Sequence, residues 1–168
     1  MLDIEEDKYY VTGTGHRLHL LPGGYDNIEN NMNIMRNVIG KKIDSFKDKD
    51  LVIISGMALG WDTALAQVAL EKNIPLVAAI PFPKQHIKWN DRSKNIYKDI
   101  IDKAFHVEVI QNYYSHWVMQ KRNEWMVDHC DSILACWNRQ SKSGTANCVR
   151  YAIKKDVKVV NLFDECGF

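Results

Sequence analysis

Three short segments of this sequence combine glycine, small hydroxyl residues and a charged residue, a combination suited to holding a phosphate. They read TGTGHR (residues 12–17), SGMALGWD (residues 55–62) and SKSGTAN (residues 141–147). Glycine at a strand-to-helix turn lets a ligand approach the main chain, and the next helix begins with N–H groups that lack intrahelical partners. If the three segments lie together, they form one site for an anionic ligand.

The glycine pair of the first segment does not fit the dinucleotide fingerprint. That fingerprint has a third glycine three residues after the second, and an acidic residue follows the second strand to hold a ribose. Leu18 stands at the third-glycine position, and the second apolar run ends in Ser55 and Gly56. An ordinary NAD-binding fold is therefore excluded.

Two arginines could meet the ligand. Arg17 follows the glycine pair, where a guanidinium could fork onto a phosphate with charge-assisted hydrogen bonds; otherwise it is a solvated surface residue. Arg122 lies in an apolar stripe of a predicted helix, and a buried charge needs a partner. It either pairs within the protein, with Asp131 as one candidate, or points into the site beside Asn123.

Each polar side chain in these segments could bind a ligand or could have a purely structural role. Ser143, Gly144 and Thr145 could hold a phosphate at a helix start, although Ser143 could also simply cap the helix. Asp62 suits the first turn of a helix without any ligand, but it could also bind sugar hydroxyls or a base edge. His16 could donate to a ligand or bond to a backbone carbonyl.

The sequence lacks the patterns of several other chemistries. No histidine pair has metal-ligand spacing, and neither a GxSxG elbow nor a Walker A lysine is present, so we expect no metal and no cofactor. The four cysteines form no CxxC pair and are expected to be reduced, buried thiols. Three tryptophans near strand ends could stack on a base or pack in the core: Trp61, Trp89 and Trp137.

Apolar runs suited to buried parallel strands alternate with helical patterns along the chain. The predicted strands span residues 9–12, 51–54, 76–80, 105–110, 132–137 and 158–163. The predicted helices begin near residues 26, 61, 91, 115 and 145. Such alternation requires right-handed crossovers, so we predict an α/β, Rossmann-like three-layer fold with a mostly parallel sheet. Ligands bind beyond the carboxyl ends of such strands, which would bring the three segments to one edge.

The ends of two predicted helices carry clear signals. Asp26, with Glu29 three residues later, is expected to open the first helix as a capping box. Asn73 and Pro75 are expected to end the second helix.

Length and composition favour one globular domain. A chain of 168 residues can bury one core, so we expect a single domain over residues 1–168. No apolar stretch is long enough to span a membrane and no signal peptide is present, which favours a cytoplasmic protein without a membrane partner. The net charge of +1 gives no general attraction for nucleic acid, which is therefore not an expected partner.

Four motifs, taken in order, resemble a known group of proteins. TGHR follows the first predicted strand, ISGMALGWD covers the end of the second, RNEWMVDHCD precedes the fifth and SGTANCVRYA follows it. Together they resemble the YpsA-like branch of the SLOG superfamily, a Rossmann-like group that also includes the Lonely Guy phosphoribohydrolases and the DNA-processing protein DprA. The resemblance covers nearly the whole chain and identifies residues 13–17 as the first ligand loop.

The resemblance implies binding of a nucleotide or a nucleotide-derived small molecule at the carboxyl edge of the sheet. With the polar residues discussed above, the residues expected to line the site are Gly13, Gly15, His16, Arg17, Ser55, Gly56, Met57, Gly60, Asp62, Arg122, Asn123, Ser143, Gly144 and Thr145. The expected role is that of a sensor, a sequestering protein or an accessory factor. Related domains often dimerise, which leaves a homo-oligomer open.

Enzymatic activity does not follow directly from the resemblance. The Lonely Guy enzymes share a PGGxGTxxE segment whose glutamate is tied to cleavage of the N-glycosidic bond. Here the segment reads SKSGTANC, with Cys148 at the glutamate position, and a thiol cannot replace a carboxylate as an acid-base group. Two alternatives stay open: a nucleoside-monophosphate N-glycosidase that uses Asp62 or Asp91 instead, and DprA-like DNA binding. The cations that favour the second lie in one loop: Lys84, Lys88, Arg92 and Lys94.

Overall fold

Residues 2–168, the part of the chain that the computed structural model describes, form a six-stranded sheet between two layers of helices. The strands are β1 (Tyr9–Gly15), β2 (Leu51–Ser55), β3 (Leu76–Ile80), β4 (His106–Val109), β5 (Ser132–Cys136) and β6 (Lys158–Asn161). The α-helices are α1 (Ile28–Asp44), α2 (Trp61–Glu71), α3 (Asp91–Lys103), α4 (Val118–Asp128), α5 (Gly144–Lys154) and α6 (Phe163–Cys166). Two 3-10 helices, η1 (Leu18–Leu20) and η2 (Gly24–Asn27), precede α1.

All six strands run parallel, in the order β4-β3-β2-β1-β5-β6. The chain builds the sheet outward from β1 to β4 and then returns to the other side of β1 for β5 and β6. The predicted α/β, Rossmann-like fold is therefore confirmed. The reversal of strand order between β1 and β5 is the place where ligands bind in open parallel sheets.

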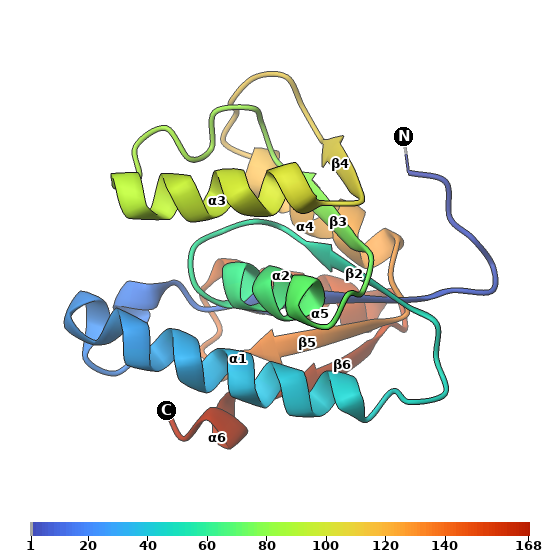
Figure 1. Cartoon of the computed structure of the whole chain (residues 1–168), viewed down its shortest axis with the longest axis horizontal. Helices are drawn as coiled ribbons and strands as arrows, with labels where there is room; N and C mark the ends of the chain where they lie inside the picture. Colours follow the sequence, from blue (N-terminus) through green and yellow to red (C-terminus); the bar gives the residue numbers. More distant parts are fainter. Residues whose placement is uncertain (1) are drawn as a thin grey trace.

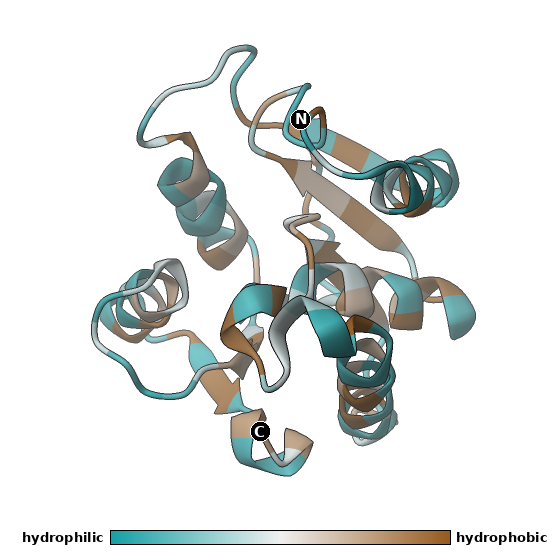
Figure 2. Ribbon diagram, turned by 90° about the vertical axis from the view of Figure 1, so that its left-hand side faces the viewer, coloured by the Kyte–Doolittle hydropathy of each residue, from teal (hydrophilic) through white to brown (hydrophobic). Residues whose placement is uncertain are grey.

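Four helices cover one face of the sheet and two cover the other (Figure 1). In the first layer, side chains such as Ile39 of α1 and Leu65 of α2 pack against Ile53 of β2. In the second, Met126 of α4 and Cys148 of α5 pack against the opposite face. Figure 2 shows hydrophobic strands in the middle and helices with largely hydrophilic outward sides. No helix in residues 2–168 is both long and apolar enough to cross a bilayer.

Alternate residues of a central strand serve opposite layers. In β2, Ile53 belongs to the core of the first layer, whereas Val52 and Ile54 belong to that of the second. Such a strand must be apolar at every position, which is why it reads as a continuous hydrophobic run. β4 lies at the edge with a neighbour on one side only, and it is less buried than the sequence suggested.

β1 is longer than predicted. The expected strand ended at residue 12, whereas β1 continues through Gly15 because residues 13–15 pair with residues 134–136 of β5. The two glycines face α2: a Cβ on Gly15 would lie 2.5 Å from Trp61 Cβ, and a Cβ on Gly13 would lie 2.7 Å from a methyl group of Leu65. Glycine here lets α2 pack closely against the strand.

The two helix ends singled out in the sequence differ in outcome. The capping box is wrong: Asp26 lies in η2, and the N-cap of α1 is Asn27, whose side chain makes no capping hydrogen bond. The extra turn of 3-10 helix carries the chain past Asp26 before α-helical bonding begins. α2 ends as predicted, because Asn73 adopts a left-handed φ of 54° and Pro75 follows it.

Candidate ligand-binding site

The turn between β2 and α2 is closed by its own hydrogen bonds. The Ser55 hydroxyl donates to Asp62 O at 2.7 Å and accepts from the Met57 N–H at 3.1 Å. Two residues take positive φ values, 57° at Met57 and 97° at Gly60. A positive φ at a residue other than glycine persists only where its surroundings fix it. Residues 55–57 are buried, so this turn presents little main chain to solvent.

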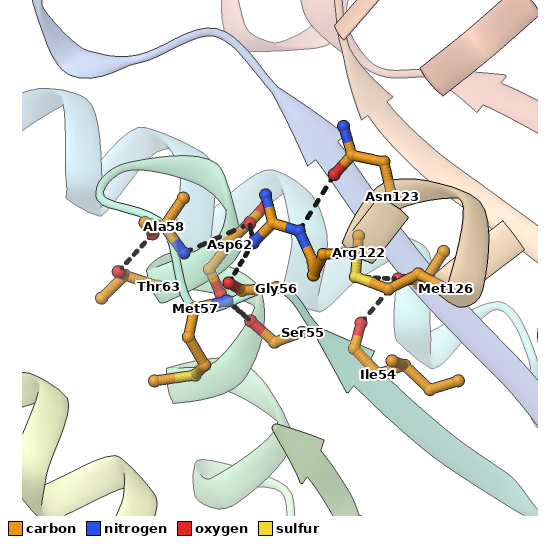
Figure 3. A network of polar contacts seen from close by, with 11 residues as sticks. Ile54, Ser55, Gly56, Met57, Ala58, Asp62, Thr63, Arg122, Asn123 and Met126 are labelled. Carbon is orange, nitrogen blue, oxygen red and sulfur yellow. Dashed lines mark hydrogen bonds and ion pairs between the residues drawn. The ribbon is translucent and has the colours of Figure 1, made fainter. Parts of the chain in front are cut away.

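Arg122 reaches from α4 into this turn (Figure 3). Its Nη1 donates to Gly56 O and lies 3.7 Å from Asp62 Oδ2, while its Nε donates to Asn123 Oδ1 at 3.0 Å. The Asp62 carboxylate also accepts from the Ala58 N–H at 3.3 Å. Arg122 and Asp62 are each 6% exposed, so they form a buried ion pair that ties α4 to the start of α2.

The charge of Arg122 is thus compensated within the protein, but its partner is Asp62 and not Asp131, the candidate that the sequence suggested. Asp131 instead accepts from the Tyr10 N–H at 2.7 Å, so that proposed pairing is wrong. Burial raises the pKa of Asp62 above its ordinary value, and the Arg122 guanidinium and the Ala58 N–H oppose this rise. Burial also lowers the pKa of Arg122, and the Asp62 carboxylate opposes that fall. Each charge is tolerated out of water because the other faces it.

His16, directly after β1, has an unmet hydrogen bond. It is 3% exposed, and its Nε2 lies 3.0 Å from the main-chain nitrogen and 2.7 Å from the side-chain oxygen of Asn138. Its Nδ1 is buried and has no partner within residues 2–168, so one ring nitrogen is left unsatisfied in either tautomer. Burial lowers the pKa of His16, which keeps the ring neutral at neutral pH, although Asn138 opposes this shift. Asn138 was not predicted; its position just after β5 is the signal that could have found it.

The start of α5 is the open part of this edge. The Ser143 hydroxyl accepts from the Ala146 N–H and its carbonyl accepts from the Asn147 N–H, each at 3.0 Å. The N–H groups of Gly144 and Thr145 occupy the first two helical positions, where no intrahelical acceptor exists. A Cβ on Gly144 would meet no atom within 4 Å. Gly144 is exposed whereas Thr145 is buried, and amides without an intrahelical acceptor at the positive end of a helix dipole suit an anion.

Two further residues of this edge differ in exposure. Arg17 is exposed, and its charge is near enough to Arg122 to contribute to the lowering of the Arg122 pKa. Cys148 is buried in α5, where burial raises the pKa of its thiol to about 11 against the opposing effects of Thr14 and Arg122. The thiol is therefore protonated at neutral pH and cannot act as a carboxylate would.

The tryptophans at strand ends make contacts within the protein. Trp61 is buried in the core and its Nε1 donates to Leu134 O at 2.8 Å, so it cannot stack on a ligand. Trp89 packs edge-on against Tyr97 with ring centroids 5.5 Å apart. Trp137 donates through Nε1 to a carbonyl three residues further along the chain at 2.9 Å.

Two surface hollows lie away from this edge. One of about 530 Å³ lies at the amino edge of the sheet, where α1 and α2 end and β2 begins. Another of about 420 Å³ lies between α2 and α3. Neither is lined by a predicted site residue, and no group of residues in the described chain, 2–168, could hold a metal ion through three histidine, cysteine or carboxylate side chains. What marks the carboxyl edge is its unmet hydrogen bonds, at His16 Nδ1 and at the start of α5.

Comparison with known proteins decides the family. A family model, YpsA, described as the YspA SLOG family, matches residues 11–162. The chain belongs to this SLOG family. It is 36% identical over 125 residues to the uncharacterized SPbeta prophage-derived protein YoqJ of Bacillus subtilis, a match that covers 64% of this chain and 72% of YoqJ. It is 26% identical over 160 residues to a UPF0398 protein of Bacillus thuringiensis, covering 90% of this chain and 85% of that protein.

Solved structures share the fold of this YpsA-family chain. DNA processing protein A of Helicobacter pylori, studied for its single-stranded DNA binding mode, matches with a TM-score of 0.59 at 20% identity, over 91% of this chain and 64% of its own. The same protein from Streptococcus pneumoniae gives a TM-score of 0.58 at 16% identity, over 90% of this chain and 49% of its own. A molybdenum cofactor binding protein of Rippkaea orientalis gives 0.57 at 17% identity, over 92% and 76%. The chain therefore spans only about half to two thirds of these DNA processing proteins, and the likeness shows the fold alone.

Proposed function

We propose that this YpsA-family protein binds a nucleotide or a nucleotide-derived small molecule at the carboxyl edge of its sheet, as a sensor, a sequestering protein or an accessory factor. The observation that carries the proposal is the pair of unpartnered amides at the start of α5. The N–H groups of Gly144 and Thr145 have no intrahelical acceptor, and the space at Gly144 is open. A phosphate oxygen would accept from these amides, and the dipole of α5 would favour its negative charge.

Two residues after β1 supply the further contacts of this proposal. Arg17 is exposed on the same edge, where its guanidinium can fork onto a phosphate. The buried Nδ1 of His16 needs a partner, and a sugar hydroxyl can both donate and accept a hydrogen bond. The two residues therefore suit the charged and uncharged parts of a nucleotide.

The turn after β2 plays a supporting part. Gly56, Asp62 and Arg122 satisfy one another, so we infer that they hold the turn in position rather than bind the ligand through their own charges. The same engagement of Asp62 argues against its use as the acid of an N-glycosidase. The SLOG family and the small-molecule binding of the molybdenum cofactor protein support a ligand-binding role.

The first experiment is native mass spectrometry of the freshly purified protein, followed by calorimetric titration with AMP, GMP, CMP and UMP. We expect a stoichiometric nucleotide complex. Gly144→Phe should abolish binding because the ring would occupy the open space. Gly144→Ala adds a Cβ that meets no atom within 4 Å, so its affinity should stay closer to that of the native protein. Failure of every nucleotide to bind would contradict the proposal.

Two further assays on the native protein test the rival functions, N-glycosidase activity and DNA binding. Incubation with the four monophosphates should release no free base, because Cys148 is a protonated thiol where a Lonely Guy-like glutamate would stand. Release of base that Asp62→Asn abolishes would put the glycosidase first. Affinity for single-stranded DNA that falls steeply with salt would instead favour nucleic acid binding.

A further inference from the structure

The connection between β4 and α4 presents three large aromatic side chains to solvent. Tyr113 is 68% exposed, Tyr114 is 62% exposed and Trp117 is 73% exposed. Folded proteins bury most such rings, and grouped apolar side chains on a surface mark sites of interaction.

Hydrogen bonds hold this connection in place. The Gln111 side-chain amide donates to Tyr113 O at 2.8 Å and to Ser115 Oγ at 3.1 Å. Its oxygen accepts from Lys121 Nζ at 3.0 Å, which ties the connection to the first turn of α4. The rings thus project from an ordered turn, which lowers the entropy lost when something binds to them.

The rings lie on the same edge as the proposed nucleotide site. The chain leaves every parallel strand at the carboxyl edge, so the connection after β4 lies there with those after β1, β2 and β5. Trp117 is the N-cap of α4, and Arg122 follows five residues later, about 7.5 Å along the helix axis. The Tyr114 ring meets Phe82, from the connection after β3, with centroids 5.5 Å apart. Figure 1 shows the connections after β3 and β4 side by side.

We propose that Tyr113, Tyr114 and Trp117 form a stacking surface for the base of the nucleotide, an inference that rests on the proposed function. Planar rings on the same edge as an anion site suit a base, since every base has a π-face that can stack on an aromatic side chain. α4 packs beside α5 through Val127 and Cys148, so the phosphate would lie at the start of α5 and the base beside the start of α4. Stacking tolerates all bases, so this surface contributes affinity for nucleotides as a class rather than a choice among them.

The test compares a nucleotide with the same sugar phosphate that lacks a base. In the full chain, Tyr114→Ala and Trp117→Ala should each weaken AMP binding about tenfold, the effect expected for the loss of one stacked ring, and leave ribose 5-phosphate binding unchanged. Trp117 makes no side-chain capping bond to α4, so its replacement should not unfold the helix. Phe105→Ala is the matched control, because Phe105 is 70% exposed but precedes β4 at the opposite edge.

Fluorescence gives a second readout that does not depend on ribose 5-phosphate. We expect AMP to quench the tryptophan emission of the native protein. Trp117→Phe keeps an aromatic ring, so it should keep AMP affinity within about twofold but lose this quenching. Unchanged AMP affinity in both alanine variants would overturn the stacking surface and leave the proposed function standing. So would a change of oligomeric state in these variants with AMP affinity intact, which would assign the rings to a second copy. Failure of AMP and the other monophosphates to bind the native protein would overturn both.

Discussion

The turn after β2 and the turn after β5 use the same residue types, yet one is closed and the other is open. Ser55 and Gly56 are buried, and their polar groups bond within the protein. Gly144, just after the cap residue Ser143, is exposed, and a Cβ there would meet no atom within 4 Å. The difference comes from what lies against each glycine: a Cβ on Gly56 would lie 2.6 Å from Arg122 Cζ of α4, whereas a Cβ on Gly144 would meet no atom within 4 Å.

This contrast separates two uses of glycine at a sheet edge. In the closed turn, glycine makes room for a side chain of the protein itself. In the open turn, it leaves the first amides of a helix accessible. Substitutions in the two turns should therefore act on different properties, the first on stability and the second on ligand affinity.

The largest expected effect is that of Arg122→Ala. It leaves the Asp62 carboxylate buried without its cation, so we expect the free energy of unfolding to fall by about 3–5 kcal/mol in urea denaturation. The control is Arg139→Ala, which breaks an exposed pair with Asp164 at 2.7 Å and should lower the free energy of unfolding far less, because solvent screens an exposed pair. Equal losses in the two variants would show that the closed turn does not depend on the buried pair.

Gly56→Ala and Gly144→Ala compare the two turns directly. A Cβ on Gly56 would lie 2.6 Å from Arg122 Cζ and 2.7 Å from Asp62 Oδ2, so we expect a loss of about 1–3 kcal/mol from overpacking. At Gly144 the change in unfolding free energy should stay within about 0.5 kcal/mol. Thermal or urea unfolding measures both, and a larger loss at Gly144 would contradict the description of an open turn.

Ser143→Ala tests whether the cap of α5 also serves a ligand. Loss of the bond from the Ala146 N–H should cost about 1 kcal/mol of stability. Asn90→Ala is the matched control, because the Asn90 side chain caps α3 in the same way, at 2.8 Å from the Ser93 nitrogen. Both variants should lose similar stability, but only Ser143→Ala should alter AMP affinity in calorimetry. An equal change of AMP affinity in both variants would show that the Ser143 cap has no separate role in ligand binding.

The smallest effect on stability is expected for Arg17→Ala. This exposed side chain contributes little to the core, so the unfolding free energy should change by less than about 0.5 kcal/mol. The affinity for AMP should fall at least tenfold, because charge-assisted hydrogen bonds of about 1.5–3 kcal/mol would be lost. Arg92→Ala, a similarly exposed arginine in α3, should change neither quantity. A loss of several degrees in melting temperature would make Arg17 structural.

The order of strands and helices could be predicted from the sequence because each central strand is buried on both faces. Every position of β2 is buried, and that burial demands the unbroken apolar run that the sequence shows. The end of α2 could also be predicted from the sequence, since Asn73 and Pro75 act on the main chain locally. The placement of glycine-rich segments at the carboxyl edge then followed from parallel strands alone.

Other features depended on contacts between residues far apart in the chain. Gly13 and Gly15 were expected in a ligand loop after the first strand. The packing of α2 through Trp61 and Leu65 is what makes glycine necessary within β1. No local pattern records that contact.

The sequence by itself determined that Arg122 needs a partner, since it stands in an apolar stripe of a helix. Only the tertiary structure decided that the partners are Asp62 and Gly56 O, because the packing of α4 against the sheet sets which turn the guanidinium reaches. The same packing decided which glycine-rich turn is closed and which is open. Hydrophobic periodicity acts over a few residues and can be read from the chain, whereas the partner of a buried charge is set by three-dimensional proximity between segments 60 residues apart, as from position 62 to position 122.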